Sequence, residues 1–185
     1  MIISYIFVVG KAMEIMELYF FDITTQDEIN KEDMPEAVLS HCKKKESFAA
    51  ADALIRMGVE NLHYGDKNKP FADNCYVSIS HSGNMVAVCK SENPIGIDIE
   101  KIDYKRDLNK IAKRFYHGKE LELFLENPTA EMFFDIWTKK EAYSKISGEG
   151  VGEVFNGFDV LSLDGYIIET ENINGYMLSV CEKEI

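Results

Sequence analysis

The feature that most constrains this fold is a switch in hydrophobic periodicity that occurs twice, in the same order. In residues 35–58 apolar side chains recur at helical spacing, and in residues 75–100 they alternate with polar ones as in strands. The same succession returns later, with helical spacing over residues 108–147 and strand-like stretches over residues 158–181. The chain is therefore predicted to be an α+β protein with two halves, each joining helices to antiparallel strands.

The halves are expected at residues 1–90 and 91–185, with residues 1–15 left uncertain or used as an extra strand. Residues 35–58 are predicted as one long helix, since Pro35 suits its first turn and Gly58 its end. Residues 64–70 have the composition of a loop. The predicted strands are residues 17–23, 75–80, 85–89, 95–100, 158–163, 166–170 and 176–181, and the later helices are residues 108–115, 121–125 and 130–147. The three strands between residues 75 and 100 are expected to form an antiparallel meander.

Composition narrows the class of partner. The chain carries 20 Lys and Arg against 32 Asp and Glu, a formal charge of −12, which argues against nucleic acid because phosphate backbones need a basic surface. Its 11% aromatic content argues against disorder. The 4 cysteines and 4 histidines show no zinc-ligand spacing and are typical of a reducing cytoplasmic setting. The apolar N-terminus is too short for a membrane span, so neither a membrane partner nor a signal peptide is expected.

Residues 95–100 contain the first candidate metal ligands. Strict alternation in Ile-Gly-Ile-Asp-Ile-Glu places Asp98 and Glu100 on one face of a strand, about 7 Å apart by the rise per residue. Mg²⁺ prefers oxygen ligands and usually binds one or two carboxylates together with water and substrate phosphates. A solvent-exposed strand face carries the same residues, so this pattern alone leaves both interpretations open.

A second pattern lies in the helix predicted over residues 130–147. Glu141 and Lys145 are four residues apart, so both side chains project from the same face. A carboxylate base beside a cation suits phosphate chemistry, but an ordinary surface ion pair has the same spacing. The single Trp, Trp137, lies one turn before Glu141 and is expected to anchor the helix in the core.

Residues 78–82, Ser-Ile-Ser-His-Ser, do not predict a serine hydrolase. Neighbouring strand residues point to opposite faces, so Ser80 and His81 cannot act together as nucleophile and base. Hydroxyl and imidazole groups at a strand end suit phosphate binding, and an ordinary polar turn is the alternative.

Four blocks of the chain resemble the 4′-phosphopantetheinyl transferases of the surfactin-synthetase-activating type: S-I-S-H-S-G, P-I-G-I-D-I-E, R-F-Y and F-x-x-x-W-T-K-K-E-A-Y-x-K-x-x-G-x-G. The blocks lie between about residues 69 and 150, in the order and spacing of that family. The resemblance implies a pseudo-twofold pair of α+β halves. It also implies a monomeric, cytoplasmic enzyme that uses Mg²⁺ to transfer phosphopantetheine from coenzyme A to a serine of an apo acyl or peptidyl carrier protein.

The resemblance further implies roles for individual residues. Asp98, Glu100 and Glu141 match the metal ligands, and Glu141 is expected to take the proton of the carrier serine directly or through water. Lys145 matches the catalytic cation at the pyrophosphate, with Lys140 supporting it. The other implied coenzyme A contacts are Lys69, Pro70, Ser80 and His81, the first two from the family's G-K-P block.

The chain departs from the family pattern at several positions. Asn68 replaces the Gly of G-K-P, Ser47 stands where a basic residue often binds coenzyme A, and Glu149 lies within the late G-x-G. Residues 43–45 are all Lys and lie a turn before Ser47, so one of them is a candidate to replace the missing basic residue. These departures predict weak discrimination between coenzyme A and dephospho-coenzyme A. Two other functions stay open, a non-catalytic coenzyme A or carrier-protein binding module and another metal-dependent phosphoryl transferase.

Overall fold

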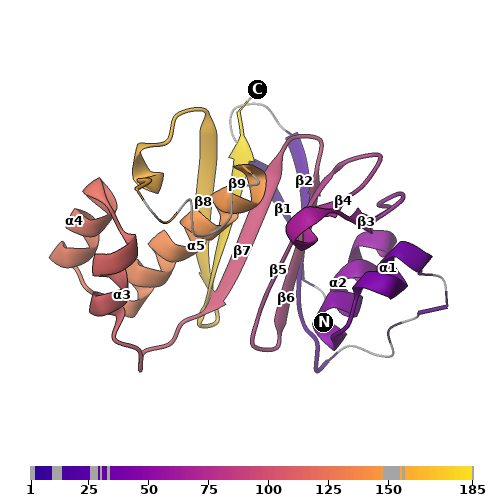
Figure 1. The fold of residues 1–185 in the computed structure, drawn as a ribbon, viewed down its shortest axis with the longest axis horizontal. Coiled ribbons are helices and arrows are strands. Elements are labelled where there is room, and N and C mark those ends of the chain that lie inside the picture. Colours follow the sequence, from indigo (N-terminus) through magenta and orange to yellow (C-terminus); the bar gives the residue numbers. More distant parts are fainter. Residues whose placement is uncertain are drawn as a thin grey trace. The chain divides into compact units, whose positions relative to one another are not determined.

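Antiparallel sheets covered by helices make up both parts of the chain, which confirms the α+β prediction (Figure 1). The computed structural model describes residues 3–9, 14–25, 29, 31–32, 34–147, 155 and 157–184. The chain divides into two units, which we call unit 1 (Met1–Ile95) and unit 2 (Gly96–Ile185). The pseudo-twofold relation between the halves stays a prediction.

Unit 1 contains a four-stranded sheet in the order β1-β2-β6-β5, in which every neighbouring pair is antiparallel. Its elements are β1 (Ile3–Val9), β2 (Glu14–Asp22), α1 (Glu36–His41), α2 (Lys45–Arg56), β3 (His63–Tyr64), β4 (Pro70–Phe71), β5 (Tyr76–Ser82) and β6 (Met85–Ser91). Helix α2 packs on β6, and its alanines let the helix approach the sheet closely. The uncertain N-terminal residues thus supply the extra strand β1, paired with β2.

Of two local predictions for unit 1, the single long helix is wrong and the loop is correct except at its ends. The helix expected over residues 35–58 is interrupted between α1 and α2, because the Ser47 hydroxyl accepts from the Lys44 N–H (3.2 Å) and starts a new helix there. The pattern looked continuous because both helices bury their apolar residues in the same core. The loop expected over residues 64–70 is confirmed for residues 65–69, while its end residues Tyr64 and Pro70 pair in the short strands β3 and β4, and the Tyr64 ring stacks on His41 at 3.8 Å.

The predicted meander of three strands is also wrong. Strands β5 and β6 pair as expected, but the other edge of β6 is occupied by β2. The third strand, β7 (Ile95–Lys101), therefore joins a different sheet with the order β7-β9-β8. Local alternation identified each strand correctly but contained no information about its partner.

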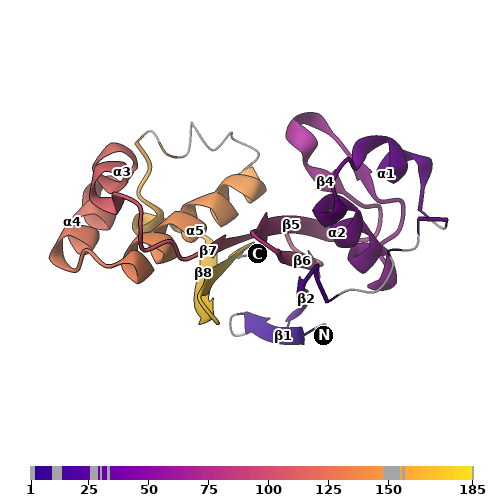
Figure 2. The same ribbon diagram turned by 90° about the horizontal axis from the view of Figure 1, so that it is seen from below.

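Unit 2 places the long helix α5 along its three-stranded sheet, where it packs on β9 and β8 (Figure 2). Its elements after β7 are α3 (Leu108–Phe115), α4 (Gly118–Glu126), α5 (Ala130–Ser147), β8 (Tyr166–Ile173) and β9 (Tyr176–Lys183). The three helices confirm the prediction, and the Thr129 hydroxyl accepts from the Met132 N–H (3.2 Å) at the start of α5. The predicted strand at residues 158–163 is wrong, since Val160–Ser162 form a 3₁₀ turn capped by Asp159. The expected stop at Gly148 lies outside the described residues.

Two general features complete the fold. All four cysteines are free thiols, and Cys42, Cys89 and Cys181 are buried. Among the residues that the structure describes, no helix combines the length and the apolar character needed to cross a membrane.

Candidate active site

The candidate site begins where β7 and α5 touch, and a glycine permits that contact. A Cβ atom on Gly96 would stand 2.0 Å from the carbonyl oxygen of Ala142 in α5. Non-bonded carbon and oxygen atoms do not approach each other so closely, so only glycine allows the two backbones to meet here. Asp98 is two residues further along the same face of β7 and is therefore brought against α5 near Lys145.

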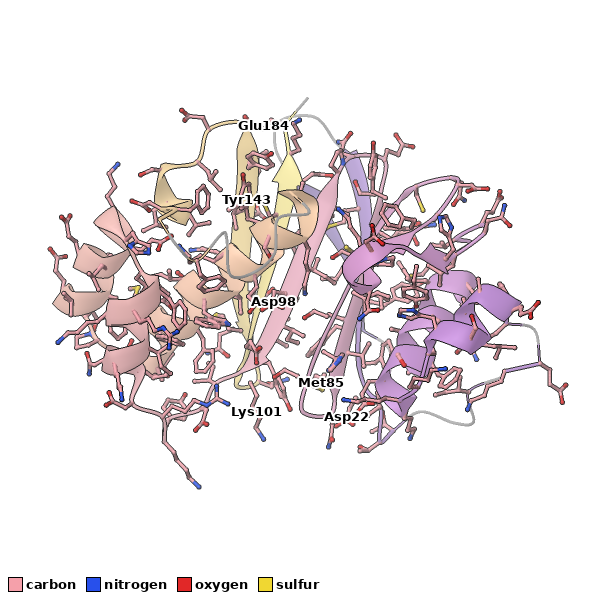
Figure 3. The ribbon with its side chains drawn as sticks, in the orientation of Figure 1. Asp22, Met85, Asp98, Lys101, Tyr143 and Glu184 are labelled. Carbon is pink, nitrogen blue, oxygen red and sulfur yellow. The ribbon has the colours of Figure 1, made fainter. Side chains whose placement is uncertain are left out.

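Asp98 is buried and paired with a lysine of α5. The residue is 3% exposed, and its position on β7 is labelled in Figure 3. Lys145 Nζ donates to Asp98 Oδ1 (2.9 Å) and to the carbonyl oxygen of Ile97 (2.6 Å). A buried carboxylate needs polar partners, and Lys145 supplies one. Since Asp98 lies on β7 and Lys145 on α5, their ion pair also joins the strand to the helix. Asp98 therefore does not belong to a solvent-exposed strand face. Glu100 is half-buried.

Glu141 is the residue whose electrostatics are most altered. Its pKa is raised from the ordinary 4.5 to about 7, chiefly by burial and then by the neighbouring charges of Asp98 and Glu100, while Lys145 and the Trp137 indole act in the opposite direction. The charges of Asp98 and Glu100 therefore both act on Glu141, with Lys145 as the cation that lowers this pKa. A carboxyl group with a pKa near neutrality is suited to accept or release a proton at physiological pH.

The donor set fits a hard divalent cation. Carboxylate oxygens are the ligands that Mg²⁺ prefers, and the excess negative charge around Glu141 would be relieved by a bound dication. In the described part of the chain, no three His, Cys, Asp or Glu side chains form a ready-made metal cage. Mg²⁺ does not need one, because it commonly combines one or two carboxylates with water and substrate phosphates.

Lys140 is adjacent to Glu141 in sequence but has different neighbours. Its side chain and that of Glu120 are both 0% exposed, and Lys140 Nζ donates to the two Glu120 carboxylate oxygens at 2.9 and 2.8 Å. A side chain without exposed surface reaches a ligand only if the structure rearranges. The predicted contact between Lys140 and coenzyme A stays a prediction.

The remaining predicted contacts lie in unit 1. Ser80 is buried and His81 is exposed, as expected for neighbours on opposite faces of β5. Lys69 precedes β4, and partial burial lowers the pKa of its ammonium group. Pro70 pairs with Tyr64 in the β3–β4 hairpin. The structure thus brings the carboxylates and Lys145 together in unit 2, and it places the other four residues on β4, β5 and the turn before β4.

The departures from the family pattern have local explanations. Asn68 adopts a φ of +61°, a left-handed conformation that glycine adopts readily and that asparagine tolerates better than most residues. The loop backbone therefore remains one that a glycine would also allow. Ser47 is engaged in starting α2, and Lys45 Nζ donates to the carbonyl oxygen of Ile23 (2.8 Å). Glu149 lies outside the described residues.

Sequence reasoning missed Gly96 and Glu120. Gly96 carried a usable signal, because a glycine inside a strand pattern often marks a close backbone approach. Glu120 carried none, since it lies in an ordinary charged helix and its partner is Lys140, 20 residues away.

Comparison with known proteins places these residues in a family. Residues 94–177 match the sequence model of the 4′-phosphopantetheinyl transferase superfamily, and this segment contains Asp98, Glu100, Glu141 and Lys145. Over this segment the chain is similar to that superfamily. The predicted resemblance is confirmed.

Individual relatives carry the same description. The chain is 40% identical over 105 residues to the 4′-phosphopantetheinyl transferase gsp of Aneurinibacillus migulanus, covering 54% of this chain and 44% of that protein. It is 32% identical over 135 residues to the 4′-phosphopantetheinyl transferase Sfp of Bacillus subtilis (strain 168), covering 64% and 59%. With the transferase ffp of Bacillus subtilis it is 31% identical over 153 residues, covering 74% and 66%. The chain spans about half the length of the curated relatives it matches.

Proposed function

We propose that this protein transfers the 4′-phosphopantetheine group from coenzyme A to a serine of an apo acyl or peptidyl carrier protein, with Mg²⁺ as cofactor. One observation carries the proposal: Asp98, Glu141 and Lys145 converge between β7 and α5, within the segment that matches the superfamily. The relatives named as 4′-phosphopantetheinyl transferases support the same activity.

The residues of the site divide the chemistry between them. Asp98, Glu100 and Glu141 would hold Mg²⁺, which supplies charge neutralisation at the pyrophosphate of coenzyme A. Lys145, already directed at Asp98, would place its ammonium group beside the pyrophosphate oxygens. The carrier serine oxygen attacks the phosphorus, and the bond to the departing adenosine 3′,5′-bisphosphate breaks. Glu141 would accept the serine proton, directly or through water, since its carboxylate lies beside the proposed pyrophosphate position.

Unit 1 supplies the proposed nucleotide contacts. We assign Lys69, Pro70, Ser80 and His81 to coenzyme A, as the motif match implies. The partly buried ammonium group of Lys69 suits a phosphate, since burial strengthens an electrostatic contact.

A basic helix face suits the anionic carrier. Helix α3 buries Ala112 and exposes Lys110, Lys113 and Arg114, which form a local positive surface on a chain with a net charge of −12. Such a surface would attract an acidic carrier helix and speed its association. The monomeric state and the cytoplasmic location are further parts of this proposal.

Intact-mass spectrometry tests the function. Apo acyl and apo peptidyl carrier proteins are incubated with the protein, coenzyme A and Mg²⁺, and the expected result is a mass increase of one phosphopantetheine group. Chelation of Mg²⁺ with EDTA, and a carrier whose acceptor serine is replaced by alanine, are the negative controls. Coenzyme A binding without any mass increase would favour the non-catalytic binding module. Release of adenosine 3′,5′-bisphosphate without carrier labelling would favour another phosphoryl transferase.

A further inference from the structure

The Glu120–Lys140 pair is an unusual feature of unit 2, because neither side chain has any exposed surface. A buried ion pair is weak evidence for stability, since the desolvation of two charges offsets their attraction, and apolar replacements of similar volume are often as stable. Stability alone therefore does not explain why a buried ion pair includes Lys140, the residue directly before Glu141. The groups that the pair contacts suggest a different role.

The pair fastens a returning part of the chain to α4 and α5. We call Phe155 and residues 157–160 the return segment. Glu120 Oε1 accepts a hydrogen bond from the Val160 N–H, and Lys140 Nζ donates a hydrogen bond to the Phe158 carbonyl oxygen. His117, directly before α4, donates through Nε2 to the Phe155 carbonyl oxygen (3.0 Å). Both charges thus hold the backbone of the return segment.

The return segment in turn contacts Trp137, which lies one turn before Glu141 on α5. The ring centroids of Phe155 and Trp137 are 4.5 Å apart, and Trp137 stacks on Phe133 at 5.5 Å on α5 itself. The Glu141 side chain lies one turn later on the same face of α5, and the neighbouring indole lowers the pKa of its carboxyl group. A continuous set of contacts therefore runs from the buried pair through Phe155 and Trp137 to the proposed base.

We propose that Glu120 and Lys140 are positioning residues, which hold the return segment against α5 so that Phe155 fixes the indole of Trp137 and, through it, the side chain of Glu141. This inference rests on the proposed function only where it concerns catalysis. It differs from the role expected from the motif, in which Lys140 would contact coenzyme A directly.

The first test needs no activity, because Trp137 is the single Trp of the chain. In the double variant Glu120→Gln/Lys140→Met both charges are removed, while the glutamine oxygen can still accept from Val160. We expect a red-shifted indole emission and stronger quenching by acrylamide than in the wild type, with cooperative unfolding retained. The matched control is Lys139→Met, which breaks a half-exposed pair with Asp135 (2.8 Å) on the same helix and should leave the emission unchanged. Wild-type emission and quenching in the double variant would overturn the proposal.

The second test separates positioning from a coenzyme A contact. A small displacement of the base from its correct position relative to the serine hydroxyl should lower kcat by about tenfold to a hundredfold. We expect this loss in the double variant, and in Lys140→Met and Glu120→Gln alone, with an unchanged KM for coenzyme A and with effects that do not add. Should a single variant fail to fold, the double variant still decides the outcome, because it leaves no unpaired buried charge.

A different pattern of KM values would contradict the positioning role. If Lys140→Met and the double variant raise the KM for coenzyme A while Glu120→Gln alone does not, Lys140 contacts the substrate and the inference is wrong. A wild-type protein that transfers nothing would defeat the proposed function, and the fluorescence comparison would still decide how the indole is held.

Discussion

Replacing Glu141 by glutamine should make the protein more stable at pH 8, although the change removes a proposed catalytic group. The native pKa of Glu141 is about 7 against an ordinary value of 4.5, chiefly because the carboxylate is buried and then because it lies near Asp98 and Glu100. Between these two pH values the native state binds a proton that the unfolded state has released. The free energy of unfolding therefore falls as the pH rises through this interval.

The magnitude follows from the difference between the two pKa values. A difference of about 2.5, at 1.36 kcal/mol per unit, amounts to about 3 kcal/mol of unfolding free energy above pH 7. Glutamine resembles the neutral acid, so Glu141→Gln should exceed the wild type by up to this amount at pH 8 and match it at pH 4.5. Urea unfolding in EDTA at the two pH values, followed by circular dichroism, measures the difference.

Mg²⁺ provides the internal check on this reasoning. A ligand at about a hundredfold its dissociation constant stabilises the native state by about 2.7 kcal/mol. Added Mg²⁺ should therefore stabilise the wild type at pH 8 and do so much less in Glu141→Gln, which should also lose transfer activity. If the two proteins differ by the same free energy at both pH values, Glu141 is not the buried, charge-crowded carboxylate described above. Near-wild-type turnover of the variant would separately remove it as the base.

Three further outcomes are expected. Asp98→Asn and Glu100→Gln should each raise the Mg²⁺ concentration needed for half-maximal activity, and unchanged titrations in both would leave these residues without a metal role. Gly96→Ala should lower the unfolding free energy by about 3 kcal/mol or more, because its Cβ meets the backbone of α5; a wild-type melting temperature would contradict the close contact. The ratio of kcat/KM for coenzyme A over dephospho-coenzyme A should stay below a hundredfold, about 2.7 kcal/mol, and a larger ratio would show an intact 3′-phosphate pocket.

Local order could be predicted from the sequence wherever a short-range rule decides it. Helices α3, α4 and α5 follow the spacing of their apolar residues, and Thr129 starts α5 by a hydrogen bond three residues away. The order of the family motifs also identifies Asp98, Glu141 and Lys145 as candidate site residues, although they lie far apart in the sequence. The helices and their starts depend on residues within one or two turns of each other, and periodicity records such relations directly.

Contacts between distant residues were decided by the tertiary structure alone. Alternation marked β7 as a strand, but its place beside β9 depended on β2 having taken the edge of β6. Helical spacing put Lys140 next to Glu141, but only the folded chain brings Glu120 and the return segment against it. The same holds for Asp98 and Lys145, which are 47 residues apart in sequence and 2.9 Å apart in space. A hydrophobic pattern states which face of an element is buried, and the packing of the whole unit determines what that face meets.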